Sequence, residues 1–197
     1  MTTSHAQRGF TLVEMIGVLA VIAILGSVAA PKIFAAIEDA KVSAYVQQIN
    51  TLTTAVAKFH SDTGLWPRHI PSHAQDRYHQ LIVNSLDNSN LIPGWQGPYL
   101  EKEMVNYITK NGYQDLFKAA NNDANWACDI DGNGTADGEF VIYRSDQISD
   151  KIAEKISNII DGDGGVTTGT KDWRKAGKVR RYQGTHASIL EVCLANI

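Results

Sequence analysis

Hydrophobic residues form one continuous run near the start of the chain. Across residues 10–30 nearly every side chain is apolar or small, and Glu14 is the only carboxylate. About 20 residues at 1.5 Å rise per residue match the roughly 30 Å hydrocarbon core of a bilayer. The run therefore predicts a membrane-spanning helix. Because a carboxylate is costly in hydrocarbon, Glu14 is a candidate functional residue.

The helical pattern continues beyond this run in an amphipathic form. Charged and amide side chains separate apolar residues that recur at helical spacing, which predicts a helix with one solvated face. The two parts together predict one helix of about 50 residues, broken or kinked near Gly26 and Pro31 and ended after Asp62. The apolar stripe consists of Ile33, Ile37, Val42, Val46, Ile49, Leu52, Val56 and Phe59.

The rest of the chain alternates between extended and helical patterns, which predicts an α+β domain. Strands are predicted at residues 139–144, 178–182 and 188–195. A helix is predicted at about residues 73–86 with Ser72 as its N-cap, and residues 101–120 are predicted to be partly helical. Ser145 is the predicted N-cap of a further helix, whose apolar face holds Ile148, Ile152, Ile156 and Ile159.

The composition favours a membrane segment plus one modest soluble domain. The chain has 197 residues and a net charge of −3, so no bulk attraction to nucleic acid is expected. The basic stretch at residues 171–181 allows three interpretations: a solvated loop, a charged subunit interface or, least favoured, a nucleic-acid contact. Neither a nucleophile triad nor zinc-type histidine spacing emerges, which favours a structural protein over an enzyme.

Two cysteines, Cys128 and Cys193, are the complete set in the chain. If their domain lies outside the cytoplasm, they can form one disulfide. That bridge would close a long loop and stabilise the domain by roughly 4 kcal/mol on the chain-entropy estimate. The alternative is a pair of buried free thiols.

Residues 129–139 place oxygen-bearing side chains at alternating positions, with a glycine after the third. This pattern is the opening half of an EF-hand-like loop and predicts a calcium site, but Phe140 stands where the bidentate glutamate would be. The alternative is an acidic, glycine-rich turn before a strand. Asp161 and Asp163 form a weaker second candidate. The candidate calcium ligands are Asp129, Asp131, Asn133, Asp137 and Glu139.

The N-terminal segment Gly9-Phe10-Thr11-Leu12-Val13-Glu14-Met15 resembles the class III signal of type IV pilins and type II secretion pseudopilins. The resemblance implies that a prepilin peptidase cuts the Gly9–Phe10 bond and methylates Phe10. It also implies that Glu14 neutralises the new amine within a filament, where an unpaired charge is very costly. Pro31 falls where the family usually has a helix-disturbing proline.

The resemblance further implies the type IV pilin fold, in which a long N-terminal helix packs on a small antiparallel β-sheet. The expected parts are a leader at residues 1–9, a hydrophobic helix at 10–31, its amphipathic half at 32–62 and a periplasmic domain at 63–197. The segment Trp95-Gln96-Gly97-Pro98-Tyr99-Leu100 is similar to one in the major pseudopilin, although the family's following Pro-x-Asp-Pro-Trp-Gly segment is missing. Calcium loops recur in major pseudopilins, which adds weight to calcium as a cofactor.

The leading hypothesis is therefore a non-enzymatic filament subunit of a type II secretion pseudopilus or a type IV pilus. Arg8 precedes the span, so the N-terminus should stay cytoplasmic while the precursor sits in the inner membrane. The implied partners are copies of itself, other pilins or pseudopilins, prepilin peptidase, an assembly ATPase and a membrane platform. The alternatives are a membrane-anchored, non-polymerising calcium-dependent binding module, and an anchored periplasmic enzyme that would need a reactive cluster.

Overall fold

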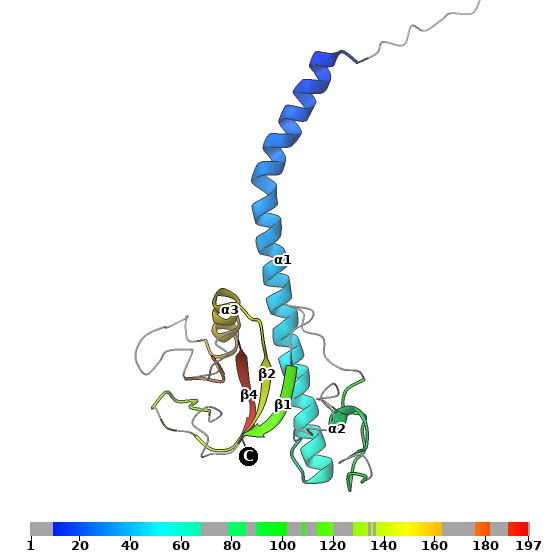
Figure 1. Cartoon of the computed structure of the whole chain (residues 1–197), viewed down its shortest axis with the longest axis vertical. Helices are drawn as coiled ribbons and strands as arrows, with labels where there is room; N and C mark the ends of the chain where they lie inside the picture. The colour runs from blue at the N-terminus through cyan, green and yellow to red at the C-terminus, as the bar shows by residue number, and fades with distance from the viewer. Residues whose placement is uncertain are drawn as a thin grey trace, which may run out of the picture. The chain divides into compact units, whose positions relative to one another are not determined.

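The structure is a computed structural model with two compact units, Met1–Ala40 and Lys41–Ile197, and Figure 1 shows its elements. The predicted leader with Gly9, the predicted N-cap Ser72 and the weaker calcium candidate Asp163 lie outside the described residues. The structure describes residues 10–67, 79–85, 90–101, 108, 114–119, 128–133, 135, 137–162, 176–181 and 189–196.

Helix α1, Leu12–Thr63, supplies the described structure of the first unit apart from Phe10 and Thr11, which precede it. Among the described residues it is the helix that is long and apolar enough to cross a membrane. The break predicted near Gly26 and Pro31 does not occur, because the helix continues through both residues. Proline removes a single backbone donor, and the turns on either side of it remain helical.

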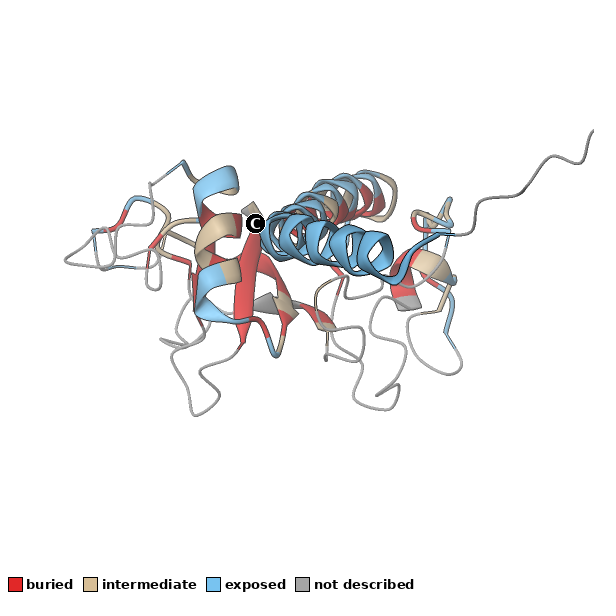
Figure 2. Cartoon of the chain, turned by 90° about the horizontal axis from the view of Figure 1, so that it is seen from above, coloured by how far each residue is buried: buried red, intermediate tan, exposed pale blue. Residues whose placement is uncertain are grey.

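Burial of α1 side chains begins in the second unit, as the change from exposed to buried colours in Figure 2 shows. The predicted apolar stripe is confirmed from Val42 onward, whereas Ile33 and Ile37 are exposed. Two polar residues, Tyr45 and Gln48, are also buried, and the apolar pattern did not predict them. The buried residues of α1 are Val42, Tyr45, Gln48, Ile49, Leu52, Ala55, Val56 and Phe59.

Within the described residues, four antiparallel strands form one sheet in the order β1-β2-β4-β3. The three predicted strands are confirmed with slightly shifted ends, but the partly helical prediction for residues 101–120 is wrong at 114–119, which form β1. This segment is extended because it pairs with β2, with Leu116 opposite Tyr143. The strands are β1 (Gln114–Ala119), β2 (Phe140–Ser145), β3 (Val179–Arg181) and β4 (Leu190–Asn196).

The main core forms between the sheet and the second half of α1. Alternate strand residues such as Val141, Tyr143 and Val192 belong to this core together with Tyr45 and Leu52 of the helix. The rings of Tyr45 and Tyr143 lie 6.0 Å apart between their centroids. Because side chains alternate between the two faces of a strand, the neighbouring residues of β2 and β4 contribute to a different cluster.

The second cluster consists of Cys128, Phe140, Ile142 and Cys193, with Ile130 packed against it. A disulfide joins Cys128 to Cys193, with their Cα atoms 6.5 Å apart, so the predicted bridge is confirmed. It links the start of the acidic loop to strand β4. A register shift between Val141 and Ile142 lies in the part of β2 that faces Cys193.

Two helix predictions need correction at their ends. Helix α3 is Asp150–Ile160, and its N-cap position is Ser149; Ser145 is instead the buried last residue of β2. Ile159, predicted on the apolar face, is exposed. Helix α2, His79–Ile82, ends earlier than predicted, because the chain turns after it and the Asn84 side chain accepts a hydrogen bond from Ile92 N–H.

Ion pairs connect β3 to the neighbouring elements. Glu191 is fully buried and lies 3.0 Å from the Arg180 guanidinium and 3.5 Å from that of Arg144. Arg181 donates to the Asp150 carboxylate and to the Ile148 carbonyl oxygen. The first part of the predicted basic stretch, residues 171–175, lies outside the described residues. Arg180 and Arg181 are buried and paired, so neither presents a basic surface to nucleic acid.

The segment from Trp95 to Tyr99 packs closely against helix α2. The rings of Trp95 and Tyr99 meet edge to face, with centroids 5.7 Å apart. Trp95 Nε1–H donates to the Gln80 carbonyl oxygen, and Tyr99 N–H donates to that of Leu81. A Cβ added at Gly97 would lie 2.6 Å from Trp95 Cζ2 and 2.9 Å from Tyr99 Cδ2. Glycine is therefore required between the two rings.

Substituting Gly97 with alanine should destabilise the second unit by about 1–3 kcal/mol, because the added methyl group forces apart two rings that are held by backbone contacts. Urea unfolding followed by tryptophan fluorescence measures the change. Gln96→Ala is the matched control, since the Gln96 side chain is exposed and its hydrogen bond to Tyr99 uses the backbone N–H. Equal stabilities for the two variants would contradict the steric argument.

Candidate functional site

The start of α1 is closed by a reciprocal set of hydrogen bonds between Thr11 and Glu14. Glu14 Oε2 accepts from Thr11 N–H and from the Thr11 hydroxyl, each at 2.8 Å. In return, Thr11 Oγ1 accepts from Glu14 N–H at 3.2 Å. This is a capping box, which satisfies two backbone donors that the first turn of a helix leaves free. The spacing Thr-x-x-Glu is visible in the sequence and could have predicted it.

The capping box defines where the helix begins relative to the predicted cleavage site. Helix α1 starts at Leu12, so Phe10 and Thr11 precede it, and the Phe10 side chain is 83% exposed. Among the described residues, hydrogen bonds reach only Oε2 of Glu14. Its second oxygen, Oε1, can therefore accept from another group without opening the cap.

The helix surface around Glu14 is apolar and exposed on every side. Large hydrophobic residues from Phe10 to Ile37 have exposed fractions between 47% and 83%. A continuous surface of this kind is not stable in water, so lipid or other protein must cover it. Glu14 is thus a carboxylate on a helix that is built for an apolar environment.

The acidic loop brings three of its five predicted ligands together. One carboxylate oxygen from each of Asp129, Asp131 and Asp137 lies within 4.8 Å of the other two. Asn133 lies in the same loop, where its Oδ1 accepts from Thr135 N–H at 2.8 Å. The Glu139 carboxylate is not one of this converging group of three. The alternating positions seen in the sequence therefore converge at three aspartates.

Backbone N–H groups hold these carboxylates in place. Asp129 Oδ1 accepts from Gly132 N–H and Asn133 N–H, while Asp137 Oδ2 accepts from Ile130 N–H and Asp131 N–H. Like charges at this separation repel one another. A hard cation with oxygen ligands would relieve the repulsion, and carboxylate oxygens are the ligands that calcium prefers.

A family model for the prokaryotic N-terminal methylation motif matches residues 4–30. This motif, the class III signal peptide, is the hallmark of type IV pilins and pseudopilins. The long helix α1 and the small antiparallel sheet are consistent with the pilin fold. No curated protein and no solved structure matches the chain. The matched residues include Glu14 and the capping box, whereas the acidic loop lies outside the match.

Proposed function

We propose that this pilin-type precursor is a structural filament subunit of a type II secretion pseudopilus or a type IV pilus. Prepilin peptidase cleaves it between Gly9 and Phe10 and methylates the new N-terminal Phe10. The observation that carries the proposal is the methylation motif at residues 4–30, which includes the start of a 52-residue helix whose first part exposes apolar side chains. The same helix spans the inner membrane in the precursor and packs among other subunits in the filament.

Glu14 supplies the charge that directs assembly. Cleavage leaves an ammonium group at Phe10, which has three hydrogen-bond donors and is costly to bury without a partner. Glu14 Oε2 already serves the capping box, and Oε1 accepts from the ammonium group of the same or a neighbouring subunit. Because one carboxylate can fulfil both roles, the helix start remains ordered while the subunits are held in register.

The two ends of the precursor lie in different compartments. The leader remains in the cytoplasm, where the basic residue Arg8 favours that side of the membrane. The second unit is periplasmic, and its disulfide is consistent with an oxidising environment. An assembly ATPase and a membrane platform then move the processed subunit from the bilayer into the filament.

Processing is tested by incubating membranes that contain the full chain with prepilin peptidase. Mass spectrometry should find a product that begins at Phe10 and carries one methyl group on its amine. Replacing Gly9 with a bulky residue such as valine should leave the precursor uncut. An intact wild-type precursor would refute the processing step.

A chain that stays uncleaved and monomeric in detergent while binding calcium would instead fit the membrane-anchored binding module.

We propose further that the acidic loop binds one calcium ion, with Asp129, Asp131 and Asp137 as carboxylate ligands and Asn133 of the same loop as an additional oxygen donor. Calorimetry on the full chain should detect binding with a Kd between about 10⁻⁴ and 10⁻³ M, as in other extracellular calcium modules. At 100-fold excess over Kd, calcium should stabilise the second unit by about 2.7 kcal/mol.

Asp131→Asn should weaken calcium binding at least about tenfold, because it removes one charge while keeping the oxygen that accepts from Asn133 N–H. Glu101→Gln is the matched control, since it makes the same charge change at an exposed position outside the loop. The absence of a binding heat, together with a melting temperature unaffected by chelator, would eliminate the calcium proposal without affecting the filament proposal.

A further inference from the structure

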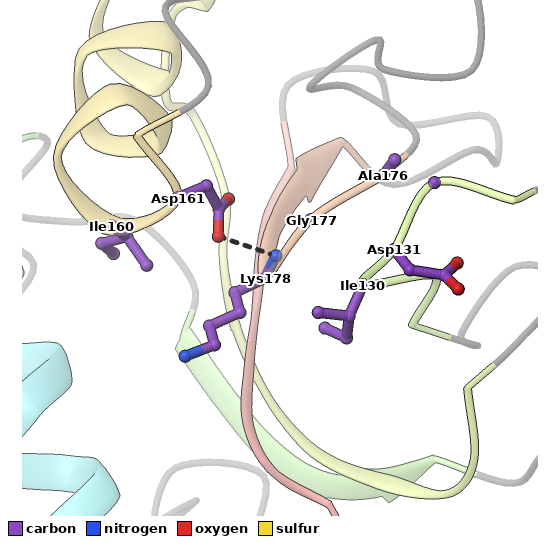
Figure 3. Close-up of a pocket in the computed structure, with 8 residues that line it drawn as sticks. Ile130, Asp131, Ile160, Asp161, Ala176, Gly177 and Lys178 are labelled. Atoms are coloured by element: carbon purple, nitrogen blue, oxygen red, sulfur yellow. Dashed lines mark hydrogen bonds between the residues drawn. The ribbon is translucent and has the colours of Figure 1, made fainter.

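Three segments of the second unit meet at a junction beside the acidic loop. Asp161, the C-cap residue of α3, accepts from Lys178 N–H at 3.0 Å and from Val179 N–H at 2.9 Å. Gly177 N–H donates to the Asp129 carbonyl oxygen at 2.8 Å. The junction thus connects the end of α3, the entry to β3 and the first residue of the acidic loop, and Figure 3 shows Asp161 and Lys178 within it.

Gly177 is closely fitted in this junction. Its φ of +98° is a backbone conformation that favours glycine, and a Cβ added there would lie 2.7 Å from Asp161 Oδ2. A cavity of about 380 Å³ lies alongside, with Asp131 and Ile130 of the loop contributing to its wall together with Asp161 and Lys178. Any displacement of the segment at Gly177 therefore alters both the loop contact and the cavity.

The disulfide closes a ring through this junction. Cys193 N–H donates to the Lys178 carbonyl oxygen at 2.8 Å, while the neighbouring Gly177 bonds Asp129, the residue after Cys128. The ring therefore runs from Cys128 through Asp129, across a hydrogen bond to Gly177 and Lys178, across a second one to Cys193, and back through the sulfur–sulfur bond. One covalent bond and two backbone hydrogen bonds close it.

The ring belongs to a different packing cluster from the helix–sheet core. Cys128 and Cys193 pack with Phe140 and Ile142, whereas the helix α1 packs against the other set of strand residues. Local opening in proteins follows such cooperative units, and a unit can open while the rest of the domain remains folded. Without the disulfide, only the two backbone hydrogen bonds would close the ring, and the packing on Phe140 and Ile142 would be the remaining support of the two cysteine positions.

We propose that the Cys128–Cys193 disulfide is a redox-controlled latch for the acidic loop. With the bond formed, the loop, the end of α3 and the entry to β3 are held as one unit. With the bond reduced, this junction opens while the core between α1 and the sheet persists. The latch closes only after the second unit reaches an oxidising compartment. The proposal is independent of filament assembly and of calcium binding.

The closing step is a thiol–disulfide exchange with a disulfide-bearing oxidant, such as an oxidoreductase of the compartment or oxidised glutathione. The thiolate of one cysteine attacks the oxidant's disulfide and forms a mixed disulfide, releasing one oxidant thiolate. The second cysteine, as thiolate, then displaces the remaining oxidant sulfur and forms the Cys128–Cys193 bond. Two thiols lose two electrons and two protons in total, and both sulfurs of the oxidant's disulfide leave as thiols, on one oxidoreductase or on two glutathione molecules.

Hydrogen exchange with mass spectrometry tests the latch on the full chain in detergent micelles. The oxidised wild type is compared with the double variant Cys128→Ser/Cys193→Ser. Amides in residues 128–137 and 176–181 should exchange about tenfold faster or more in the variant, whereas those in residues 42–59 should change less than about twofold. A uniform increase across both regions would overturn the proposal, as would unchanged exchange in the loop.

A second pair of variants keeps the test decisive if the serine variant fails to fold. Gly177→Ala breaks the ring by its contact with Asp161 while the disulfide remains intact, so it should accelerate exchange in the same two segments. Val192→Ala, in the main core, should accelerate exchange in residues 42–59 as well. If Gly177→Ala leaves the exchange of residues 128–137 unchanged, or gives the same pattern as Val192→Ala, the ring does not hold the loop and the proposal fails.

Discussion

Replacing Glu14 with alanine should abolish filament assembly while leaving membrane insertion and cleavage after Gly9 intact. The variant leaves the Phe10 ammonium group without a carboxylate in an apolar filament interior, and breaking a buried ion pair costs about 3–5 kcal/mol. At every subunit contact this corresponds to a weakening of more than about a hundredfold. Filament yield, measured by electron microscopy and by immunoblotting of sheared filaments, reports the effect.

Glu14→Gln separates the ion pair from the capping box. Glutamine can still accept the Thr11 hydrogen bonds, as the second partner of a capping box may be either glutamate or glutamine, but it carries no charge. If the ion pair directs assembly, the glutamine and alanine variants should be equally defective. Asp39→Ala is the control, because Asp39 is an exposed acid on the same helix beyond the apolar run. Normal filaments in Glu14→Gln would assign the role of Glu14 to the cap.

Replacing Glu191 with alanine should be among the most destabilising changes in the second unit. Arg180 would then remain buried without the carboxylate that lies 3.0 Å away, which costs about 3–5 kcal/mol. At about 2–4 °C per kcal/mol for a chain of this size, the melting temperature should fall by roughly 6–20 °C. Thermal unfolding followed by circular dichroism measures the shift.

Asp150→Ala provides the matched control, because it removes the carboxylate partner of the adjacent Arg181. The Asp150 side chain is 80% exposed, and Arg181 keeps its hydrogen bond to the Ile148 carbonyl oxygen, so this variant should cost less than Glu191→Ala does. If the two variants have similar melting temperatures, the burial of the carboxylate does not determine how much stability is lost when it is removed.

The Glu191 carboxyl should also make the free energy of unfolding depend on pH. Burial raises the pKa of Glu191 above its usual 4.5, and the charges of Arg180 and Arg144 oppose the rise. The folded state therefore retains this proton to a higher pH than the unfolded chain. The contribution of Glu191 to stability is fully present below about pH 4.5 and declines as the pH rises through its folded-state pKa. Glu191→Gln should remove that decline.

Local patterns were sufficient for the long helix and for three of the four strands. The apolar run and the amphipathic stripe repeat at helical spacing over many turns, so α1 could be predicted almost to its end at Thr63. The segments that became β2, β3 and β4 are rich in β-branched and other apolar residues bounded by turn signals. The methylation motif could also be identified from the sequence alone, because processing enzymes recognise contiguous residues near the N-terminus.

Local patterns failed where a distant partner determined the conformation. Residues 114–119 contain helix-compatible side chains, but their pairing with β2 makes them a strand. Ser145 resembles an N-cap, yet it completes the buried strand β2, and the next helix begins after Ser149. Two features could nevertheless be predicted without knowing which distant residues are in contact. The two cysteines allow one possible disulfide, and the loop aspartates lie close together in the sequence.

The sequence by itself determined the membrane-length helix, its Glu14 and processing motif, the α+β class and the candidate loop, because each depends on residues within one local segment. Only the tertiary structure decided the order of the strands, the burial of Arg180 beside Glu191 and the ring through Gly177 and Cys193. These features join residues that are 9 or more positions apart. They arise because β3 and β4 pair in one register, and side-chain packing across the whole unit selects that register.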